Sequence, residues 1–173
     1  MSRYKFIAVL DVDELIVPLH HEGWAAMMEE VVKESGTKTV SSWHFRHVYF
    51  FDNMTSPEDE LDEPHLHMLQ HVYRSSLYTP PGHYVKCFHN PDTVLTLHNH
   101  FAYDTLFPGG RKGYHAVGTT VGHLAHYRAS CVGEIKKSCW KYKKASVRDT
   151  TLRRWGDRVT TNTSKVLNLL NLI

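Results

Sequence analysis

Hydrophobic and polar positions along the chain predict short strands mixed with helices. A continuous apolar run over 6–10 is typical of a buried strand of the kind found in parallel sheets. Apolar residues recur at helical spacing over 24–32, with charged residues on the opposite face, and Gly36 can act as the C-cap of this helix. The high content of β-branched and aromatic residues over 39–51 indicates a further strand.

The second half of the chain continues this mixed pattern. Acidic residues and prolines over 53–64 predict a loop, and the basic tail is expected to form two helical pieces. We expect a short helix over 65–75, strands over 84–88 and 94–97, and a glycine-rich loop over 107–113. A short apolar element is expected over 121–127, and the two tail helices over 150–155 and 164–172. No repeat or linker divides the sequence, so we expect one α/β domain spanning residues 1–173.

Composition narrows the possible classes of protein. With 173 residues and 42% hydrophobic content, the chain can bury an ordinary core, and a formal net charge of +2 gives no electrostatic basis for binding nucleic acid. No stretch approaches the roughly 20 apolar residues of a membrane span, and the first residues do not form a secretory signal. Taken alone, these absences predict a cytosolic protein.

Two other features favour the secretory pathway. N-glycosylation sequons begin at Asn53 and Asn162. Cys131 and Cys139 are close enough in sequence to form a short disulfide loop, which would leave Cys87 unpaired. Free thiols in a cytosolic protein would explain the same cysteines equally well.

The strand expected over 6–10 ends directly on an Asp-x-Asp motif, formed by Asp11 and Asp13. Because strand residues alternate faces, the two carboxylates should point the same way while Val12 points into the protein. Two carboxylates at the carboxyl end of a strand can bind Mn²⁺ or Mg²⁺, and such a metal stabilises a departing nucleoside diphosphate as a Lewis acid. The alternative is a solvated turn at the start of a helix.

Residues 6–18, FIAVLDVDELIVP, are similar to the signature fiDvDEfivP of the glycosyltransferase family 92 domain. Residues 86–94 (KCFHNPDTV) are similar to the family segment Ksiv.Pe.v, and His100 lies where the family has a histidine. Residues 123–128 (HLAHYR) are similar to the segment l.HYR, and Lys141 and Lys144 lie where the family has basic residues. Each motif is weak alone, whereas their ordered combination is fairly specific and spans nearly the whole chain.

This resemblance implies a GT-A-type fold, in which helices flank a mixed α/β sheet, and a nucleotide-sugar donor. In the better-known members the donor is UDP-galactose, the linkage formed is β, which makes the transfer inverting, and the acceptors are N-glycan or polysaccharide residues. The resemblance also implies Mn²⁺ at the Asp-x-Asp motif and a type II membrane protein of the Golgi.

One part of the family domain has no counterpart in this sequence. The nucleotide-binding βαβ portion that precedes the Asp-x-Asp strand is not found here. We therefore expect the C-terminal part of the domain, with one apolar and exposed sheet edge, and we expect the membrane anchor to belong to the same missing portion. An inactive remnant of such an enzyme is the alternative.

The resemblance gives roles to three residues at the metal. Asp13 is expected to bind the ion, and Asp11 to bridge to the metal, the ribose or the diphosphate. His126 would complete the site, since neutral imidazole suits Mn²⁺. The alternative for His126 is a core histidine bonded to the backbone.

Three further residues are expected at the substrates. Arg128 can pair with the diphosphate through two hydrogen bonds or form a structural salt bridge. Lys86 and His100 face the donor or the acceptor, or else have packing or surface roles. An inverting transfer also needs a general base, and the candidates, none of which is assigned, are Asp104 and the acidic residues Glu58, Asp59, Glu60, Asp62 and Glu63.

A nucleotidyltransferase that binds metal through carboxylates would also carry Asp-x-Asp on a strand. Such an enzyme is expected to show a third acidic residue on a neighbouring strand and a basic face for nucleic acid, and neither is evident in the sequence. The leading hypothesis is therefore a metal-dependent glycosyltransferase, with the nucleotidyltransferase and the non-catalytic remnant as alternatives.

Overall fold

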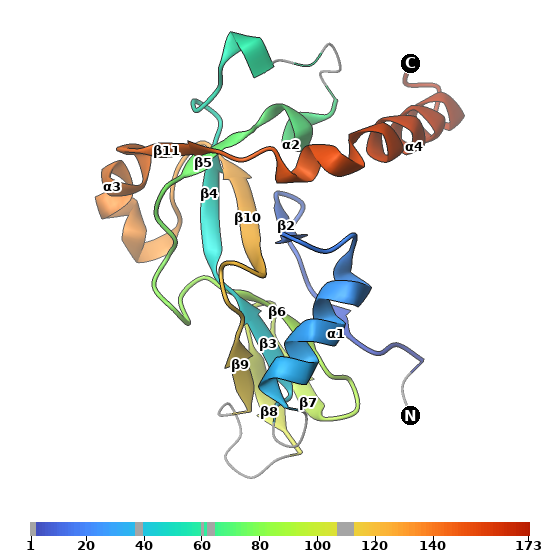
Figure 1. Cartoon of the computed structure of the whole chain (residues 1–173), viewed down its shortest axis with the longest axis vertical. Coiled ribbons are helices and arrows are strands. Elements are labelled where there is room, and N and C mark those ends of the chain that lie inside the picture. Colours follow the sequence, from blue (N-terminus) through green and yellow to red (C-terminus); the bar gives the residue numbers. More distant parts are fainter. Residues whose placement is uncertain (1–2, 37–39, 60, 62–64, 107–112) are drawn as a thin grey trace. The chain divides into compact units, whose positions relative to one another are not determined.

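The computed structural model describes residues 3–36, 40–59, 61, 65–106 and 113–173 (Figure 1). Within this part the chain forms two compact units. One comprises Met1–Tyr49 and Leu77–His126, and the other comprises Phe50–Ser76 and Tyr127–Ile173. Both units contain strands and helices, which confirms an α/β protein. The GT-A arrangement and the single catalytic domain stay predictions.

The first unit contains a mixed four-stranded sheet in the order β1-β6-β3-β9. Its strands are Ile7–Ala8 (β1), Lys86–His89 (β6), Ser42–Phe45 (β3) and Tyr114–Ala116 (β9). β6 runs antiparallel to both of its neighbours, while β3 and β9 are parallel. The strand predicted over 94–97 is confirmed as β7 (Val94–Leu97), which pairs with β8 (Ala102–Thr105).

A second sheet has β2 (Glu14–Pro18) next to β10 (Gly122–Arg128), which lies beside β4 (His47–Phe51). β2 and β10 are antiparallel, with His126 opposite Glu14. Gly122 is required where β10 starts, because a Cβ there would lie 2.8 Å from Met27 Sδ and 3.2 Å from the Val17 carbonyl oxygen. The register places His126 beside the residue that follows the Asp-x-Asp motif.

Helix α1 (Trp24–Ser35) packs its apolar face on the core of the first unit. Met27, Met28 and Val31 are buried there, at the helical spacing that the sequence predicts. The helix ends at Gly36, whose positive φ of 69° suits a residue without a side chain. The strands contribute most of the remaining buried members of this cluster, which include Ile16, Trp43, Phe45, Phe88 and Leu124.

The apolar run from Phe6 to Leu10 is not an interior parallel strand, and this prediction is wrong. Only Ile7–Ala8 pairs with a neighbour, and it does so antiparallel, at the edge of the sheet. Every second residue of the run, starting with Phe6, packs against the core, while Ile7 and Val9 between them are exposed. Alternate side chains of this segment are therefore buried, on one face of the strand only. A run of apolar residues in the sequence does not distinguish such a strand from one that is buried on both faces.

The second unit is built from short helical elements and one two-stranded sheet. β5 (Tyr73–Ser75) pairs antiparallel with β11 (Ser146–Arg148). The helical elements are, in chain order, η1 (Pro57–Asp59), α2 (His67–Gln70), η3 (Gly133–Ser138), α3 (Cys139–Lys143), η4 (Thr151–Trp155) and α4 (Gly156–Leu169). The tail is helical as predicted, although α4 begins earlier than expected. None of the helices in the described residues is long and apolar enough to cross a membrane.

A disulfide and a group of ion pairs stabilise the second unit. A disulfide joins Cys131 to Cys139, which confirms that pairing. The buried Asp59 carboxylate accepts hydrogen bonds from Arg148 at 2.6 Å and from Arg153 at 3.3 Å, and Arg148 holds the pKa of Asp59 below its usual range. A carboxylate held by two guanidinium groups suits a structural role better than that of a general base, and the candidates Glu60, Asp62 and Glu63 lie outside the described residues.

Candidate functional site

The Asp-x-Asp motif lies in a tight turn that leads into β2, not on a strand. The turn is closed by a hydrogen bond of 3.1 Å from the Glu14 N–H to the Asp11 carbonyl oxygen. Val12 is 99% exposed, so the prediction that it points into the protein is wrong. The reason is that a turn of this kind does not alternate faces as a strand does.

Three carboxylates leave this turn with different exposures. The side chains of Asp11 and Asp13 are 56% and 35% exposed, whereas Glu14 is buried. Glu14 Oε2 also accepts a hydrogen bond of 3.2 Å from the Asp11 N–H. Glu14 thus fixes the turn from inside, and the two aspartates remain accessible to a ligand.

Lys86 supplies a buried positive charge to this turn. Its side chain is fully inaccessible, and Nζ lies 2.9 Å from Asp11 Oδ2 and 3.0 Å from Glu14 Oε2. Burial lowers the pKa of Lys86, but hydrogen bonds to the two carboxylates outweigh this effect and raise the pKa above its usual value. The hydrogen bond with Lys86 likewise lowers the pKa of Asp11. Lys86 therefore offsets part of the negative charge of the turn from inside, and a direct contact with a substrate stays a prediction.

His126 faces the motif from β10. Its Nε2 lies 3.1 Å from Asp13 Oδ2, which confirms the predicted proximity of the two residues. Its Nδ1 lies 3.0 Å from His47 Nε2 and 3.5 Å from Glu14 Oε1. The ring is also stacked on Tyr49, with centroids 5.8 Å apart. His126 is therefore a buried side chain with one nitrogen directed at the accessible carboxylate and the other held by the protein.

His47 and Tyr49 belong to this site and were missed by the sequence reasoning. They are two residues apart on β4, so they lie on the same face of the strand. Both are fully buried, and their rings are 4.3 Å apart. The available signal was a polar histidine at the start of an otherwise apolar strand, which identifies a candidate residue but does not show what that residue faces.

Asp13 and His126 fit a divalent metal ion. Two adjacent ligands with bonds of about 2.0–2.2 Å lie roughly 3 Å apart, and Asp13 Oδ2 and His126 Nε2 are separated by 3.1 Å. The contacts of His126 with Glu14 and His47 are of the kind that fix the ring and tautomer of a metal-binding histidine. Because Asp13 is partly exposed, the outer side of such an ion would be open to water or phosphate.

Asp11 fits the metal less directly than Asp13. Its carboxylate is held by Lys86. Within the described part of the chain, Asp11, Asp13 and His126 do not bring three ligand atoms within 4.8 Å of one another. Ligation of one ion by both aspartates therefore stays a prediction.

His100 lies close enough to the motif to influence it electrostatically. Its Nδ1 donates to the Val85 carbonyl oxygen over 2.9 Å, which fixes the ring beside β6. After the larger effects of Lys86, the charge of His100 adds a further lowering of the pKa of Asp11. A substrate contact by His100 stays a prediction.

Two other candidates, Asp104 and Arg128, lie on β8 and β10. Asp104 is exposed on β8, where its Oδ1 accepts a hydrogen bond of 2.9 Å from the Thr105 N–H. Arg128 is the last residue of β10 and belongs to the second unit, where its carbonyl oxygen accepts a hydrogen bond from the Asp52 N–H. The expected roles of Asp104 as base and of Arg128 at the diphosphate stay predictions.

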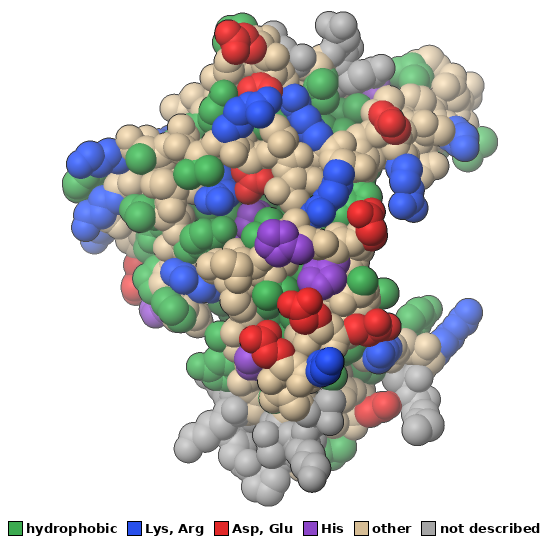
Figure 2. Space-filling view, in the orientation of Figure 1, with side chains coloured by type: hydrophobic (Ala, Val, Ile, Leu, Met, Phe, Trp, Pro, Cys, Tyr) green, Lys and Arg blue, Asp and Glu red, His purple; other side chains and the backbone are tan. Residues whose placement is uncertain are grey.

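Charged side chains on the face shown in Figure 2 are interspersed. Lys and Arg side chains lie among Asp and Glu side chains, with histidines between them. A surface for nucleic acid is expected to carry a continuous basic stripe, and the described residues on this face do not form one. The pattern agrees with the near-neutral net charge.

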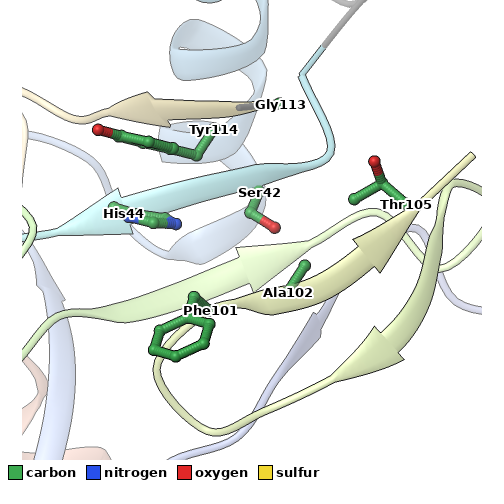
Figure 3. A pocket seen from close by; sticks show the side chains of 7 residues that line it. All are labelled: Ser42, His44, Phe101, Ala102, Thr105, Gly113 and Tyr114. Atoms are coloured by element: carbon green, nitrogen blue, oxygen red, sulfur yellow. The ribbon is translucent and has the colours of Figure 1, made fainter. Parts of the chain in front are cut away.

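A small cavity beside β3 and β8 is shown in Figure 3. Its volume of about 10 Å³ is room for about one water molecule, which is far too small for a nucleotide. Burial lowers the pKa of His44, which stacks on Tyr114 here, to about 4. The lining residues are Ser42, His44, Phe101, Ala102, Thr105, Gly113 and Tyr114. We therefore place no substrate in this cavity.

One comparison with known proteins gives a match, and the matched range includes the residues of this site. The sequence model described as glycosyltransferase family 92 matches residues 1–163 of the chain. No curated protein and no solved structure matches the chain. The matched range includes the Asp-x-Asp turn, Lys86, His100 and all of β10.

Proposed function

The chain belongs to glycosyltransferase family 92, and from this premise we propose that it transfers galactose from a UDP-sugar to a glycan acceptor, with inversion and with a divalent metal. Family membership supports sugar transfer in general. The observation that carries the metal-dependent proposal is the pair of Asp13 and His126, 3.1 Å apart beside the exposed turn. A carboxylate together with a neutral imidazole suits Mn²⁺, and Mg²⁺, which prefers oxygen ligands, is the second choice.

In this proposal Asp13 and His126 hold the ion, which would stabilise the charge that develops on the departing diphosphate. Glu14 and His47 orient the imidazole of His126 from behind. Lys86 pairs with the buried Glu14 without presenting its own charge to solvent. The exposed Asp11 carboxylate faces the donor and accepts a hydrogen bond from a ribose hydroxyl.

We also propose that the protein works in the lumen of the Golgi. The disulfide between Cys131 and Cys139 supports an oxidising compartment. The two sequon asparagines, Asn53 and Asn162, are both exposed, as glycan attachment requires. Digestion with an endoglycosidase after expression in a secretory host tests this: loss of mass from the chain is expected, and an unchanged mass in every secreted preparation argues against the compartment.

A direct binding experiment tests the site without requiring a known acceptor. Purified chain is titrated with Mn²⁺ while the free ion is followed by its electron paramagnetic resonance signal, first alone and then with UDP present. We expect UDP to bind only with Mn²⁺, and Asp13→Asn to weaken Mn²⁺ binding by more than about tenfold.

The matched control is Glu29→Gln, which makes the same carboxylate-to-amide change at an exposed position of α1. Glu29→Gln should bind Mn²⁺ as the unaltered chain does. Equal Mn²⁺ binding by Asp13→Asn and Glu29→Gln would show that Asp13 is not a ligand. UDP binding that needs no metal would remove the metal from the proposal while leaving sugar transfer to be tested by turnover.

A further inference from the structure

A second group of metal-binding side chains lies in the second unit. Asp52, His67 and His71 each offer one ligand atom, and the three atoms lie within 4.8 Å of one another. Among the described residues this is the group that gathers three such atoms, and it shares no residue with the Asp-x-Asp site. It consists of two imidazole nitrogens and one carboxylate oxygen.

The local fold explains why these three side chains meet. His67 and His71 are four residues apart at the two ends of α2, so they lie on one face, and their rings are 4.1 Å apart. Asp52 follows the end of β4, in a turn closed by a hydrogen bond of 2.9 Å from the Met54 N–H to the Phe51 carbonyl oxygen. The ring of Tyr127 lies edge-on to both histidines and packs beside the pair.

The hydrogen bond of His71 fixes its tautomer in a form that binds metals. His71 Nδ1 lies 2.8 Å from the backbone oxygen of His67. A carbonyl oxygen only accepts, so Nδ1 carries the hydrogen, and Nε2 of the neutral ring keeps its lone pair. Histidines that bind metals are usually held in this way, through their other nitrogen and a carbonyl or carboxylate oxygen. The buried His71 is therefore set as a rigid ligand.

We propose that Asp52, His67 and His71 bind Zn²⁺, which joins the end of β4 to α2. Two imidazoles and one carboxylate suit Zn²⁺, whereas Ca²⁺ and Mg²⁺ prefer oxygen ligands throughout. Zn²⁺ bonds of about 2.0–2.2 Å in a tetrahedron place its ligands roughly 3.3–3.5 Å apart. Asp52 and His67 are exposed and His71 is buried, so water would complete the tetrahedron from the exposed side.

This proposal does not depend on sugar transfer or on the metal at Asp13. Its test uses the full chain without a histidine tag, stripped with a chelator and titrated with Zn²⁺ alone by calorimetry. Co²⁺ is added in a parallel titration, because its visible bands report tetrahedral coordination by nitrogen and oxygen. The variants are Asp52→Asn and His67→Ala, both at exposed positions, so their folds should be maintained.

We expect Asp52→Asn and His67→Ala each to weaken Zn²⁺ binding by at least about tenfold and to lose the tetrahedral Co²⁺ spectrum. The matched control is His20→Ala, which removes an exposed histidine outside both sites and should bind Zn²⁺ as the unaltered chain does. Asp13→Asn should also retain this Zn²⁺ site. Unchanged Zn²⁺ affinity in His67→Ala, or an equal loss in His20→Ala, overturns the proposal.

A structural consequence gives a second readout. Zn²⁺ that binds only the folded chain raises the temperature of unfolding, by an amount that grows with its concentration. The rise should occur in the unaltered chain and in Asp13→Asn, and should be absent in Asp52→Asn and His67→Ala. A rise of the same size in all four proteins would show that Zn²⁺ acts elsewhere.

Discussion

The buried amine of Lys86 lies 2.9 Å from one carboxylate oxygen of Asp11, so the first aspartate of the Asp-x-Asp motif already has a cation that the chain provides. The second aspartate, Asp13, is paired with His126. The two aspartates are therefore not equivalent. Asp13 is the better candidate for an added metal ion, and Asp11 is tied to the stability of the turn.

Replacing Lys86 by methionine should lower the free energy of unfolding by about 3–5 kcal/mol, because Glu14 would be left as a buried and uncompensated charge. Most of this loss is expected from Glu14, since Asp11 is largely exposed and solvent screens its pairing. Urea unfolding measures the change. Lys33→Met, at an exposed position of α1, is the control and should change stability by less than about 0.5 kcal/mol. A similar small change in Lys86→Met would contradict the proposed role of the ion pair.

His47 should act on the metal site through His126. Its replacement by phenylalanine retains a ring against Tyr49 but removes the nitrogen that contacts His126 Nδ1. We expect Mn²⁺ affinity to fall by about 10–100-fold while UDP binding at saturating Mn²⁺ changes little. The Mn²⁺ titration described above measures both quantities. Unaltered Mn²⁺ affinity in a folded His47→Phe protein would leave His47 with a packing role only.

Acid should destabilise the first unit through two buried histidines. Burial lowers the pKa of His44 and of His89 to about 4, below the usual 6.5. The folded state therefore binds fewer protons than the unfolded state between these values, and stability rises with pH across this window and falls on acidification. Each histidine contributes a slope of up to about 1.4 kcal/mol per pH unit.

Urea unfolding at several pH values between 4 and 7 tests this dependence, with the window taken from the two pKa values. His44→Phe keeps a ring stacked on Tyr114 and should reduce the slope. His20→Ala, which removes an exposed histidine, should leave it unchanged. Equal slopes for all three proteins would show that other groups control the acid response.

The disulfide-bonded cysteines and the free Cys87 should differ in their effect on stability and in their reaction with thiol reagents. Breaking the Cys131–Cys139 disulfide is expected to cost about 2–3 kcal/mol, given the short loop that it closes. Burial raises the pKa of the Cys87 thiol, which should be unreactive in the folded chain. A thiol reagent should therefore label no cysteine in the native protein, one after unfolding, and all three after unfolding with a reductant. Labelling of the native protein would contradict the burial of Cys87.

Local elements were predictable where periodicity and capping agree, as in α1, which has buried residues at helical spacing and a glycine at its end. The strand predicted over 94–97 also has the same bounds in the structure, as β7. The environment of Phe6–Leu10 was not predictable, because an apolar run does not show which neighbours a strand will have. Membership of glycosyltransferase family 92 was predicted from the order of weak motifs and is confirmed.

The predicted proximity of Asp13 and His126 is confirmed, whereas the residues that surround this pair were not predicted. Lys86 is 75 positions from Asp11, and no local pattern indicates that they pair. His47 and Tyr49 were read only as part of a strand. The same limit applies to Asp52, since the spacing of His67 and His71 is visible in the sequence but their carboxylate neighbour is not.

The almost complete exposure of Val12 makes the turn suitable for a reporter group. A Val12→Cys chain would present one reactive thiol, because Cys87 is buried and the other cysteines are joined to each other. A fluorophore attached there would sit between the two aspartates without displacing any core side chain. Its emission would report the arrival of an ion or a nucleotide directly, without any acceptor being present.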